Sequence, residues 1–436
     1  MRKQQTSTKG KSVKGDMKLH VPRINSFFAG IGGFDIGFER AGFTTAFLCE
    51  INPFCNRVLK THWPNVPMGG DIGKLEAAKI PQAEVWCGGF PCQDISVARG
   101  ALGRKGLGGS RSGLFYEYAK LIEKRKPKVV VIENVEGLFN SNKGRDFGVI
   151  LQRLTKLGYA VSWRLFNSRY FGVPQSRARV YICCWKGSVV HSMRAMFENT
   201  RTPKPKNERT DFITESNPAN VFPKVPKVAY CLAATSGRHT GTDWSRTYVS
   251  CVDGVRRMTP KEYERLQGFP DLWTIPSGCD ADNDDVDTLR YTALGNAVSV
   301  PVVEWVAKRI KNELGAKGNA IDLCDVTEYV PELRIPAVDI DLETTDFTDK
   351  TKEFKWPKSG LAWRRHYVGG NIPPSPAVPV LSELFGIAEK NKVGARYYLS
   401  PNACRGILRR VDGQGRKLFS PLRTALEKET KKTKGA

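Results

Sequence analysis

The sequence predicts an α/β protein with a mostly parallel, doubly wound sheet, and three observations lead to this fold class. The chain has 436 residues, which is enough for two or three domains with a sizeable core. Between residues 21 and 185, short apolar runs alternate with helical segments, a rhythm that is typical of βαβ units. The first apolar run ends in a glycine-rich turn, as expected where such a sheet meets a ligand. The expected strands cover residues 23–28, 45–50, 84–87, 129–133 and 180–184.

Changes in composition along the chain place the domain boundaries. A basic, polar arm is expected over residues 1–20, and both a solvated tail and a phosphate-binding arm fit its composition. The α/β domain then covers residues 21–185. Beyond it we expect a polar irregular domain, helices that return to the first domain, an acidic proline-spaced linker and a basic module: residues 186–256, 257–315, 316–353 and 354–436.

Helices in the second half of the chain are marked by their end signals. Thr259, Pro260 and Glu262 have the spacing of an N-cap, a first-turn proline and a capping box. Gly268 is expected to end that helix, and a second helix with one apolar face then runs to about Leu314. The basic module is expected to contain a helix with three arginines: Arg405, Arg409 and Arg410.

Charge and cysteine content limit the functional class. Lys and Arg number 68 while Asp and Glu number 44, so the formal net charge of +24 favours a polyanionic partner, above all nucleic acid. A ribosomal or membrane-surface protein would share this charge. The 11 cysteines show no regular paired spacing, and no apolar run reaches about 18 residues. We therefore expect a cytoplasmic protein with reduced thiols, without a secretory signal or a membrane span.

The glycine-rich turn at residues 28–33 is the first candidate ligand site. Its sequence is Phe-Ala-Gly-Ile-Gly-Gly, and glycines there let backbone amides approach a ligand at a helix N-terminus. Glu50 ends the second strand, where its carboxylate could accept hydrogen bonds from a ribose diol. Asp71 could meet an adenine amino group, although an Asx-turn is the simpler interpretation. Alone, the pattern also fits a tight turn, and it is not the G-x-G-x-x-G of dinucleotide-binding folds.

Other strand ends carry reactive or charged side chains. Cys92 follows the strand at 84–87, at the carboxyl edge where doubly wound sheets bind ligands. Glu133 ends an unusually apolar strand, where a carboxyl group is costly unless it is paired or functional. Arg177 and Arg179 offer fixed positive charge that could orient Glu133 and a pyrimidine carbonyl. Taken singly, an inert cysteine and surface arginines explain the same residues.

The ordered set of motifs resembles that of the DNA (cytosine-5)-methyltransferases. The motifs are Phe-Ala-Gly-Ile-Gly-Gly, Gly-Asp-Ile, Gly-Phe-Pro-Cys-Gln, Glu-Asn-Val, Gln-Ser-Arg-Ala-Arg, Arg-Leu-Gln-Gly-Phe-Pro and Leu-Gly-Asn-Ala-Val. The resemblance covers roughly residues 24–312 and keeps the order and spacing of the family's motifs. It implies a Rossmann-like fold that uses S-adenosyl-L-methionine, with a smaller target-recognition domain at residues 186–256.

The resemblance also assigns roles to the candidate residues. Cys92 would attack carbon 6 of a cytosine, and Glu133 would hold or protonate ring nitrogen 3. Arg179, together with Arg177, would grip the carbonyl oxygen. Carbon 5 would then take the methyl group of S-adenosylmethionine, after the target base has been flipped out of the duplex. The expected cofactor pocket consists of Phe28, Ala29, Gly30, Gly32, Gly33, Glu50, Ile51, Asp71, Ile72, Gly89, Pro91 and Asn296.

Duplex DNA is the expected partner of a monomeric enzyme, and no metal site is expected. Segment 99–113 is rich in glycine and cationic side chains and fits a lid that closes on DNA, although a plain flexible loop has the same composition. Polar residues at 238–246 are able to read base edges. The expected DNA-binding residues are Arg99, Arg104, Lys105, Arg111, Arg238 and Arg246. The basic C-terminal module resembles tails of phage-encoded relatives, and it could bind DNA or pack on the core.

Other functions fit parts of the sequence. A nicotinamide-dependent oxidoreductase would explain the glycine turn and Glu50, but not Cys92 or Glu133. A tRNA cytosine-5 methyltransferase would share the fold and the chemistry, and the sizeable recognition segment favours DNA. A DNA-binding protein without catalysis would not need Cys92, Glu133 and Arg179 together. The expected role is DNA modification or protection against restriction, and the sequence fits an enzyme with or without a cognate restriction endonuclease.

Overall fold

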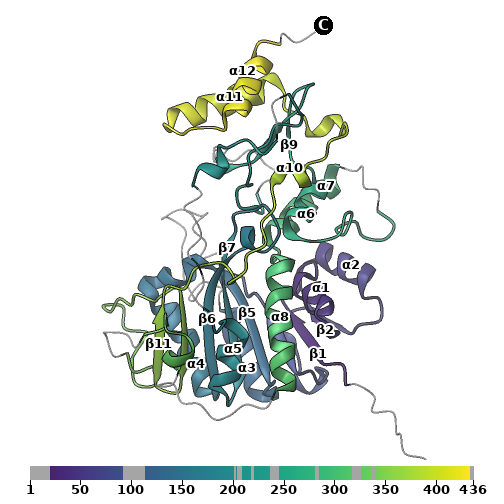
Figure 1. The fold of residues 1–436 in the computed structure, drawn as a ribbon. Helices are drawn as coiled ribbons and strands as arrows, with labels where there is room; N and C mark the ends of the chain where they lie inside the picture. The colour runs from purple at the N-terminus through teal and green to yellow at the C-terminus, as the bar shows by residue number, and fades with distance from the viewer. Residues whose placement is uncertain are drawn as a thin grey trace, which may run out of the picture.

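The computed structural model describes most of the chain (Figure 1). The described residues are 20–91, 113–200, 203, 209–217, 220–235, 245–279, 284–316, 326–334 and 340–432. Apart from His20, the basic arm expected over residues 1–20 lies outside them. Within these ranges, no helix combines the length and the apolar character needed to cross a membrane.

A nine-stranded sheet forms the centre of the described structure, in the order β11-β10-β6-β7-β5-β4-β1-β2-β3. Neighbours from β3 to β5 are parallel, whereas β7 runs antiparallel between β5 and β6. β10 is antiparallel to both β6 and β11. The predicted α/β class with a mostly parallel sheet is confirmed. The strands are β1 (Arg23–Phe27), β2 (Thr44–Cys49), β3 (Met68–Gly69), β4 (Val85–Gly88), β5 (Val129–Val135), β6 (Tyr159–Asn167), β7 (Ala178–Lys186), β10 (Ser359–Trp363) and β11 (His366–Gly370).

All five predicted strands are present, but the sequence pattern did not reveal β6. This strand carries Ser162 and Arg164, which are both fully buried and interrupt its apolar run. The Arg164 guanidinium donates to the carbonyl of Met196 over 3.1 Å and pairs with Glu198 at 2.6 Å. Because its partners come from a distant segment, no local periodicity could indicate that this arginine is buried.

Helices cover both faces of the sheet. On one face, α1 (Gly33–Arg40), α5 (Val189–Met196) and α8 (Val300–Gly315) share a buried core with the strands. On the other face, α3 (Leu114–Arg125) and α4 (Arg145–Lys156) do the same. A further helix, α2 (Pro53–His62), follows β2. This doubly wound arrangement brings the ends of β1, β2, β4 and β5 to one edge of the sheet, called here the carboxyl edge.

Helix α5 lies inside the range expected for the recognition domain, yet it belongs to the sheet layers. Its Val189 and Met193 are buried in the same core as Val306 of α8. The helix has only eight residues, which is too short for a clear helical period to stand out from a polar neighbourhood. The change to irregular chain therefore follows α5 and does not occur at residue 186.

The end signals of the returning helices are confirmed. α6 (Pro260–Gln267) has Thr259 as N-cap in a capping box with Glu262, and Gly268 adopts the left-handed conformation that ends it. α7 (Asp284–Asn296) and α8 follow. Since Val302, Val306 and Ile310 are buried against the sheet, the predicted apolar face of α8 is also observed.

The expected linker at 316–353 and the start of the expected C-terminal module are built into the sheet layers. The short helix α9 (Val326–Tyr329) contributes Val326 to one core, and Phe347 enters the other. β10 pairs with β6, so the hairpin β10–β11 extends the sheet. Isolated apolar side chains in irregular segments have no period, which explains why composition alone suggested a solvated linker.

The last part of the chain packs on the recognition region. The two-stranded sheet of β8 (Tyr248–Ser250) and β9 (Val255–Arg257) shares a core with α11 (Pro401–Gly413) and α12 (Ser420–Thr430). The helix predicted for the basic module is therefore present, with Ser400 as its N-cap. A short helix, α10 (Leu384–Ile387), precedes them. Figure 1 shows α11 and α12 at the end of the molecule that lies farthest from the sheet.

Candidate active site

The glycine turn after β1 is open at one glycine and tightly packed at the next two. Gly30 has a φ of +56°, and a Cβ atom added to it would meet nothing within 4 Å. A Cβ on Gly32 would collide with the ring of Trp63, and one on Gly33 would lie 2.6 Å from Val298. Gly32 and Gly33 thus allow close packing, whereas Gly30 leaves room for a ligand over the backbone.

Glu50 is fixed by backbone amides at the end of β2. Its carboxylate accepts hydrogen bonds from the amides of Gly30, Ile51 and Asn52 at 2.8 to 2.9 Å. The neighbouring Ile51 side chain is 69% exposed, which is unusual for a large aliphatic residue. An anchored carboxylate therefore lies beside an open glycine and an uncovered apolar side chain.

Asp71 and Ile72 follow β3 on the same side. The Asp71 carboxylate accepts a hydrogen bond from the amide of Gly73 at 3.0 Å, which is the Asx-turn considered as the simpler interpretation. Its other carboxylate oxygen makes no hydrogen bond within the described chain, and Ile72 is buried. The turn thus orients Asp71, and its second carboxylate oxygen is able to accept a hydrogen bond from a ligand.

The returning segment closes the glycine turn from the other side. Val298 contacts the position of Gly33, and the indole N–H of Trp273 donates to the carbonyl of Ile31 over 2.8 Å. Asn296, the last residue of α7, is exposed two residues before Val298. The structure therefore brings the last motif of the sequence next to the first.

Glu133 and Arg179 form a pair at the carboxyl edge. The Glu133 side chain is 11% exposed, and its Oε1 lies 3.1 Å from Nε of Arg179. Burial raises the pKa of Glu133 above its ordinary value, and the guanidinium groups of Arg179 and Arg177 reduce that rise without cancelling it. A carboxyl of this kind can remain protonated where an exposed glutamate would be charged.

Arg177 takes a different position from the one expected for a residue that contacts substrate. Its guanidinium is buried and donates to the carbonyls of Leu232, Gly295 and Ala297 at 2.7 to 3.1 Å. Leu232 lies in the recognition region, whereas Gly295 and Ala297 lie at the end of α7 and directly after it. Both terminal nitrogens of Arg177 donate to these carbonyls, so Arg177 joins backbone segments around Arg179.

Residues before Cys92 line the same edge. A Cβ added to Gly89 would lie 3.1 Å from the Glu133 carboxyl, so a larger residue would require this carboxyl to shift by a few tenths of an ångström. Asn134 donates to the carbonyl of Phe90 over 3.5 Å, next to Pro91. Cys92 itself lies outside the described residues. So do five of the expected DNA-binding residues: Arg99, Arg104, Lys105, Arg111 and Arg238.

Arg246, the remaining expected DNA-binding residue, lies in the recognition region. It is partly exposed and donates to the carbonyl of Thr235 over 3.0 Å. It lines a small hollow together with Tyr248 and with Phe419 of the C-terminal helices. Its position is therefore tied to the last part of the chain.

Sequence reasoning overlooked Cys231. The residue is exposed, and its sulfur lies 3.5 Å from Arg177 Nη1 and 3.9 Å from Arg179 Nη2. Desolvation of the sulfur raises its pKa, but the two guanidinium groups outweigh this effect and leave the pKa below its ordinary value. No local pattern marks Cys231, because its neighbours are 50 residues away in the sequence.

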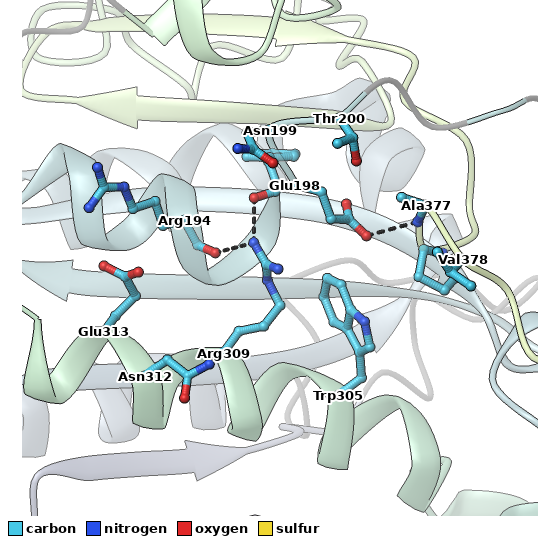
Figure 2. Close-up of a pocket in the computed structure, with 12 residues that line it drawn as sticks. Arg194, Glu198, Asn199, Thr200, Trp305, Arg309, Asn312, Glu313, Ala377 and Val378 are labelled. Atoms are coloured by element: carbon cyan, nitrogen blue, oxygen red, sulfur yellow. Dashed lines mark hydrogen bonds between the residues drawn. The ribbon is translucent and has the colours of Figure 1, made fainter.

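One cavity of the described structure lies away from the carboxyl edge. A cavity of about 490 Å³ lies between α5, α8 and residues 376–378 (Figure 2). Two of its charged groups are already used in the fold, since Arg309 donates to the carbonyl of Ala195 and Glu198 accepts from the amide of Ala377. We therefore do not assign the cofactor to this cavity.

Comparisons with known proteins agree with the geometry. A family model described as C-5 cytosine-specific DNA methylase matches residues 23–231 and 233–312. The type II methyltransferase M.NgoBI of Neisseria gonorrhoeae is 32% identical over 307 residues, covering 64% of this chain and 90% of the relative. M2.BsuMI of Bacillus subtilis, another type II methyltransferase, is 30% identical over 317 residues, covering 67% of this chain and 76% of the relative. The solved structure of the Entamoeba histolytica methyltransferase EhMeth aligns with a TM-score of 0.49 at 18% identity, over 68% of this chain and 100% of the other.

The family match extends over well more than half of the chain. It includes the glycine turn, the Glu133 strand and the returning helices, which are the elements that meet at the carboxyl edge. Enzymes of this family transfer the methyl group of S-adenosylmethionine. The chain therefore belongs to the C-5 cytosine-specific DNA methylases and is a DNA (cytosine-5)-methyltransferase that uses S-adenosylmethionine.

Proposed function

We propose that the carboxyl edge holds a flipped-out cytosine between Cys92 and the Glu133–Arg179 pair. The observation that carries this proposal is the buried ion pair of 3.1 Å at the end of β5. A carboxyl group with a raised pKa is able to donate a proton to ring nitrogen 3 of cytosine. The fixed positive charge of the Arg179 guanidinium, beside that carboxyl, suits it to bind the neighbouring carbonyl oxygen of the base.

The proposed reaction begins with a covalent bond. The Cys92 thiolate adds to carbon 6, and the ring electrons move towards nitrogen 3, where Glu133 supplies the proton. Carbon 5 is then nucleophilic, and S-adenosylmethionine supplies the methyl group that this carbon takes. Loss of the carbon 5 proton to a base expels the Cys92 thiolate, and nitrogen 3 returns its proton to Glu133, which restores the aromatic ring. Glu133 and Arg179 hold the base throughout, while Arg177 keeps the surrounding backbone in place.

We propose that S-adenosylmethionine lies over the open side of the glycine turn. The exposed Ile51 and the partly covered Phe28 offer apolar contact to an adenine, and the anchored Glu50 carboxylate can accept from a ribose diol. Asp71 has an acceptor left for the adenine amino group. The proposed pocket is completed by the backbone at Gly30, the buried Ile72, the strand end from Gly89 to Pro91 and the exposed Asn296. Ala29, Gly32 and Gly33 shape the glycine turn itself.

The biological setting is also a proposal. The matched relatives are named type II methyltransferases, which supports a role in restriction and modification with a cognate endonuclease. We propose a cytoplasmic monomer, in line with the free thiols of the nine described cysteines. The part of the chain between α5 and α6 is proposed to read the target sequence, with residues 238–246 as its base-reading positions, while the segment at 99–113 closes on the DNA.

Cys92→Ala tests the proposed chemistry. We expect no methyl transfer to duplex DNA, while binding of S-adenosylmethionine remains within about twofold, because Cys92 contacts the base and not the cofactor pocket. Methyl transfer is measured with radiolabelled cofactor, and binding by calorimetry. Cys279→Ala, at a partly exposed cysteine away from this edge, is the matched control and should keep its activity.

A second measurement identifies the bond and the substrate. Duplex DNA that contains 5-fluorocytosine should trap a covalent adduct, since the carbon 5 proton is missing, and mass spectrometry should place the adduct on Cys92. Substantial turnover by Cys92→Ala, or an adduct elsewhere, would refute the proposed nucleophile. Methyl transfer to tRNA without transfer to DNA would favour the alternative substrate, and bisulfite sequencing would report the methylated site.

A further inference from the structure

The C-terminal helix pair, α11 and α12, lies outside the part of the chain that the family model matches, so the methylase assignment does not explain it. Its inner side is apolar: Cys404, Ile407 and Val411 of α11 are buried in one core with Leu422 and Leu426 of α12. The same core contains residues of β8 and β9. The pair is therefore held on the recognition region by ordinary packing, and its outer side is left to face its surroundings.

The outer side of the helix pair is strongly cationic. Residues 400–432 contain nine Lys and Arg but three acidic residues. Each of the three acids is already paired, as Asp412 and Glu427 contact Arg423 and Glu429 contacts Lys432. Four exposed cations have neither an ion pair nor a side-chain hydrogen bond in the described residues: Arg409, Lys417, Lys428 and Lys431. The surface therefore presents positive charge with no unpaired acid among the described residues of the pair.

Helical geometry separates these charges from the core. Arg409 is five residues after Cys404 and two before Val411, which puts it on the side of α11 opposite to its buried residues. Lys428 is six residues after Leu422 and two after Leu426, which puts it on the outer side of α12, and Lys431 is the exposed residue that directly follows this helix. The cations thus point away from the packed interior, where they would have been costly to bury.

The pair also contacts the part of the molecule that is expected to meet DNA. Arg246 lines a small hollow together with Leu418, Phe419 and Leu422, so the recognition region and the helix pair form one continuous surface there. A polyanion held by the recognition region would continue past this junction. Duplex DNA has one phosphate per 1.7 Å or so of its axis, which is the charge pattern that such a surface complements.

We propose that α11 and α12 bind the phosphate backbone of the duplex that flanks the target sequence, and so lengthen the DNA segment that the enzyme holds. The contacts are to phosphates, because Lys and Arg on an exposed helix surface neutralise charge without reading bases. The inference rests on duplex DNA as the substrate. It adds a second contact region to the site at the carboxyl edge.

The test replaces the four unpaired cations by glutamine: Arg409→Gln, Lys417→Gln, Lys428→Gln and Lys431→Gln in one protein. Affinity is measured for duplexes with a central target site and lengths of about 14 and about 40 base pairs. The wild-type enzyme should bind the longer duplex more tightly than the shorter one at equal site concentration. In the variant, the ratio of these two affinities should be lower by about tenfold or more. The slope of log affinity against log salt on the long duplex should also become less steep by about 2 to 4, since each lost phosphate contact removes about 0.9.

Two controls keep the result specific. Lys124→Gln with Lys156→Gln removes exposed cations at the ends of α3 and α4, at the opposite edge of the sheet, and should leave the length preference as in wild type. Thermal unfolding should show that the four-site variant keeps its fold. Equal length preference and equal salt slopes in variant and wild type would overturn the proposal, as would a loss that appears with tRNA and not with DNA. Methyl transfer to the short duplex reports separately on the carboxyl edge, so failure of that site would be seen independently.

Discussion

The carboxyl edge of the sheet and the C-terminal third of the chain differ in what their side chains do. At the edge, the backbone is open at Gly30, Ile51 is exposed, and Glu133 has a raised pKa. In residues 326–432, apolar side chains instead complete existing cores, with Leu333 in one and Trp356 in the other. Chemistry requires particular residue types at particular strand ends, whereas packing requires only apolar volume. The chemical requirement therefore leaves a recognisable motif in the sequence, whereas the packing requirement does not.

Arg164 shows how firmly the C-terminal third is tied to the sheet. Its buried guanidinium pairs with Glu198 and donates to the carbonyl of Ser375 over 2.6 Å, in the segment that follows β11. Glu198 in turn accepts from the amide of Ala377. Burial would raise the pKa of Glu198, but the Arg164 guanidinium outweighs it and holds that pKa below its ordinary value. A buried charge with partners from both regions makes them one structural unit.

Removing the C-terminal third should have the largest effect. A chain that ends at Gly315 is expected to lose cooperative folding, because several large side chains of each core disappear. Each such side chain contributes about 1.5 to 3 kcal/mol, so the loss exceeds the 5 to 15 kcal/mol or so by which a domain is usually stable. Urea unfolding followed by circular dichroism measures this.

A second truncation sharpens the comparison. A chain that ends at Ser382 keeps β10, β11 and the Arg164 contacts and loses the helix pair, so it should still unfold cooperatively. If the chain that ends at Gly315 unfolds with the wild-type midpoint, the C-terminal third is not part of the sheet layers.

The sequence indicated which strand ends form the candidate site, and particular residues explain what it could not indicate. Cys92, Glu133 and Glu50 were identified because each follows an apolar strand, and parallel strands bring such positions to one edge. The role of Arg177 could not be predicted, because its three carbonyl partners belong to segments 55 and about 120 residues away. Likewise, β6 was hidden by the buried Arg164, and the hairpin β10–β11 was taken for the start of a separate module since nothing local relates it to the sheet.

Substitution of the two arginines at the edge should have different effects, one on activity and the other on stability. Arg179→Gln is expected to lower kcat/KM by about 10² to 10³, as for loss of a donor to a charged or polarised oxygen, with little change in unfolding. Arg177→Gln is expected to lower the unfolding free energy by about 3 kcal/mol, because it leaves three backbone carbonyls without their donor. Steady-state kinetics and urea unfolding of both variants provide the comparison. If Arg177→Gln loses activity at full stability, Arg177 acts on the substrate directly.

Asp35 offers a further test, which concerns a buried acid that has no ion pair within the described residues, unlike Glu198. It lies in α1 behind the glycine turn and is fully buried, and Ser26 donates to its Oδ2 over 3.0 Å. Burial raises the pKa of Asp35 from 3.8 to about 7. The folded protein therefore keeps a proton that the unfolded chain releases, and stability falls as pH rises from about 4 to about 7. The slope contributed by this group is about 1.4 kcal/mol per pH unit.

Asp35→Asn should remove that slope, because an amide stays neutral at every pH. The expected result is an unfolding free energy that is less dependent on pH between 4 and 7 than that of the wild type, with the largest difference above pH 7. Urea unfolding at a series of pH values gives both curves. Parallel curves for the two proteins would mean that Asp35 is charged in the folded state. Asp35 would then be a buried acid whose charge is stabilised by its surroundings, as Glu198 is by Arg164.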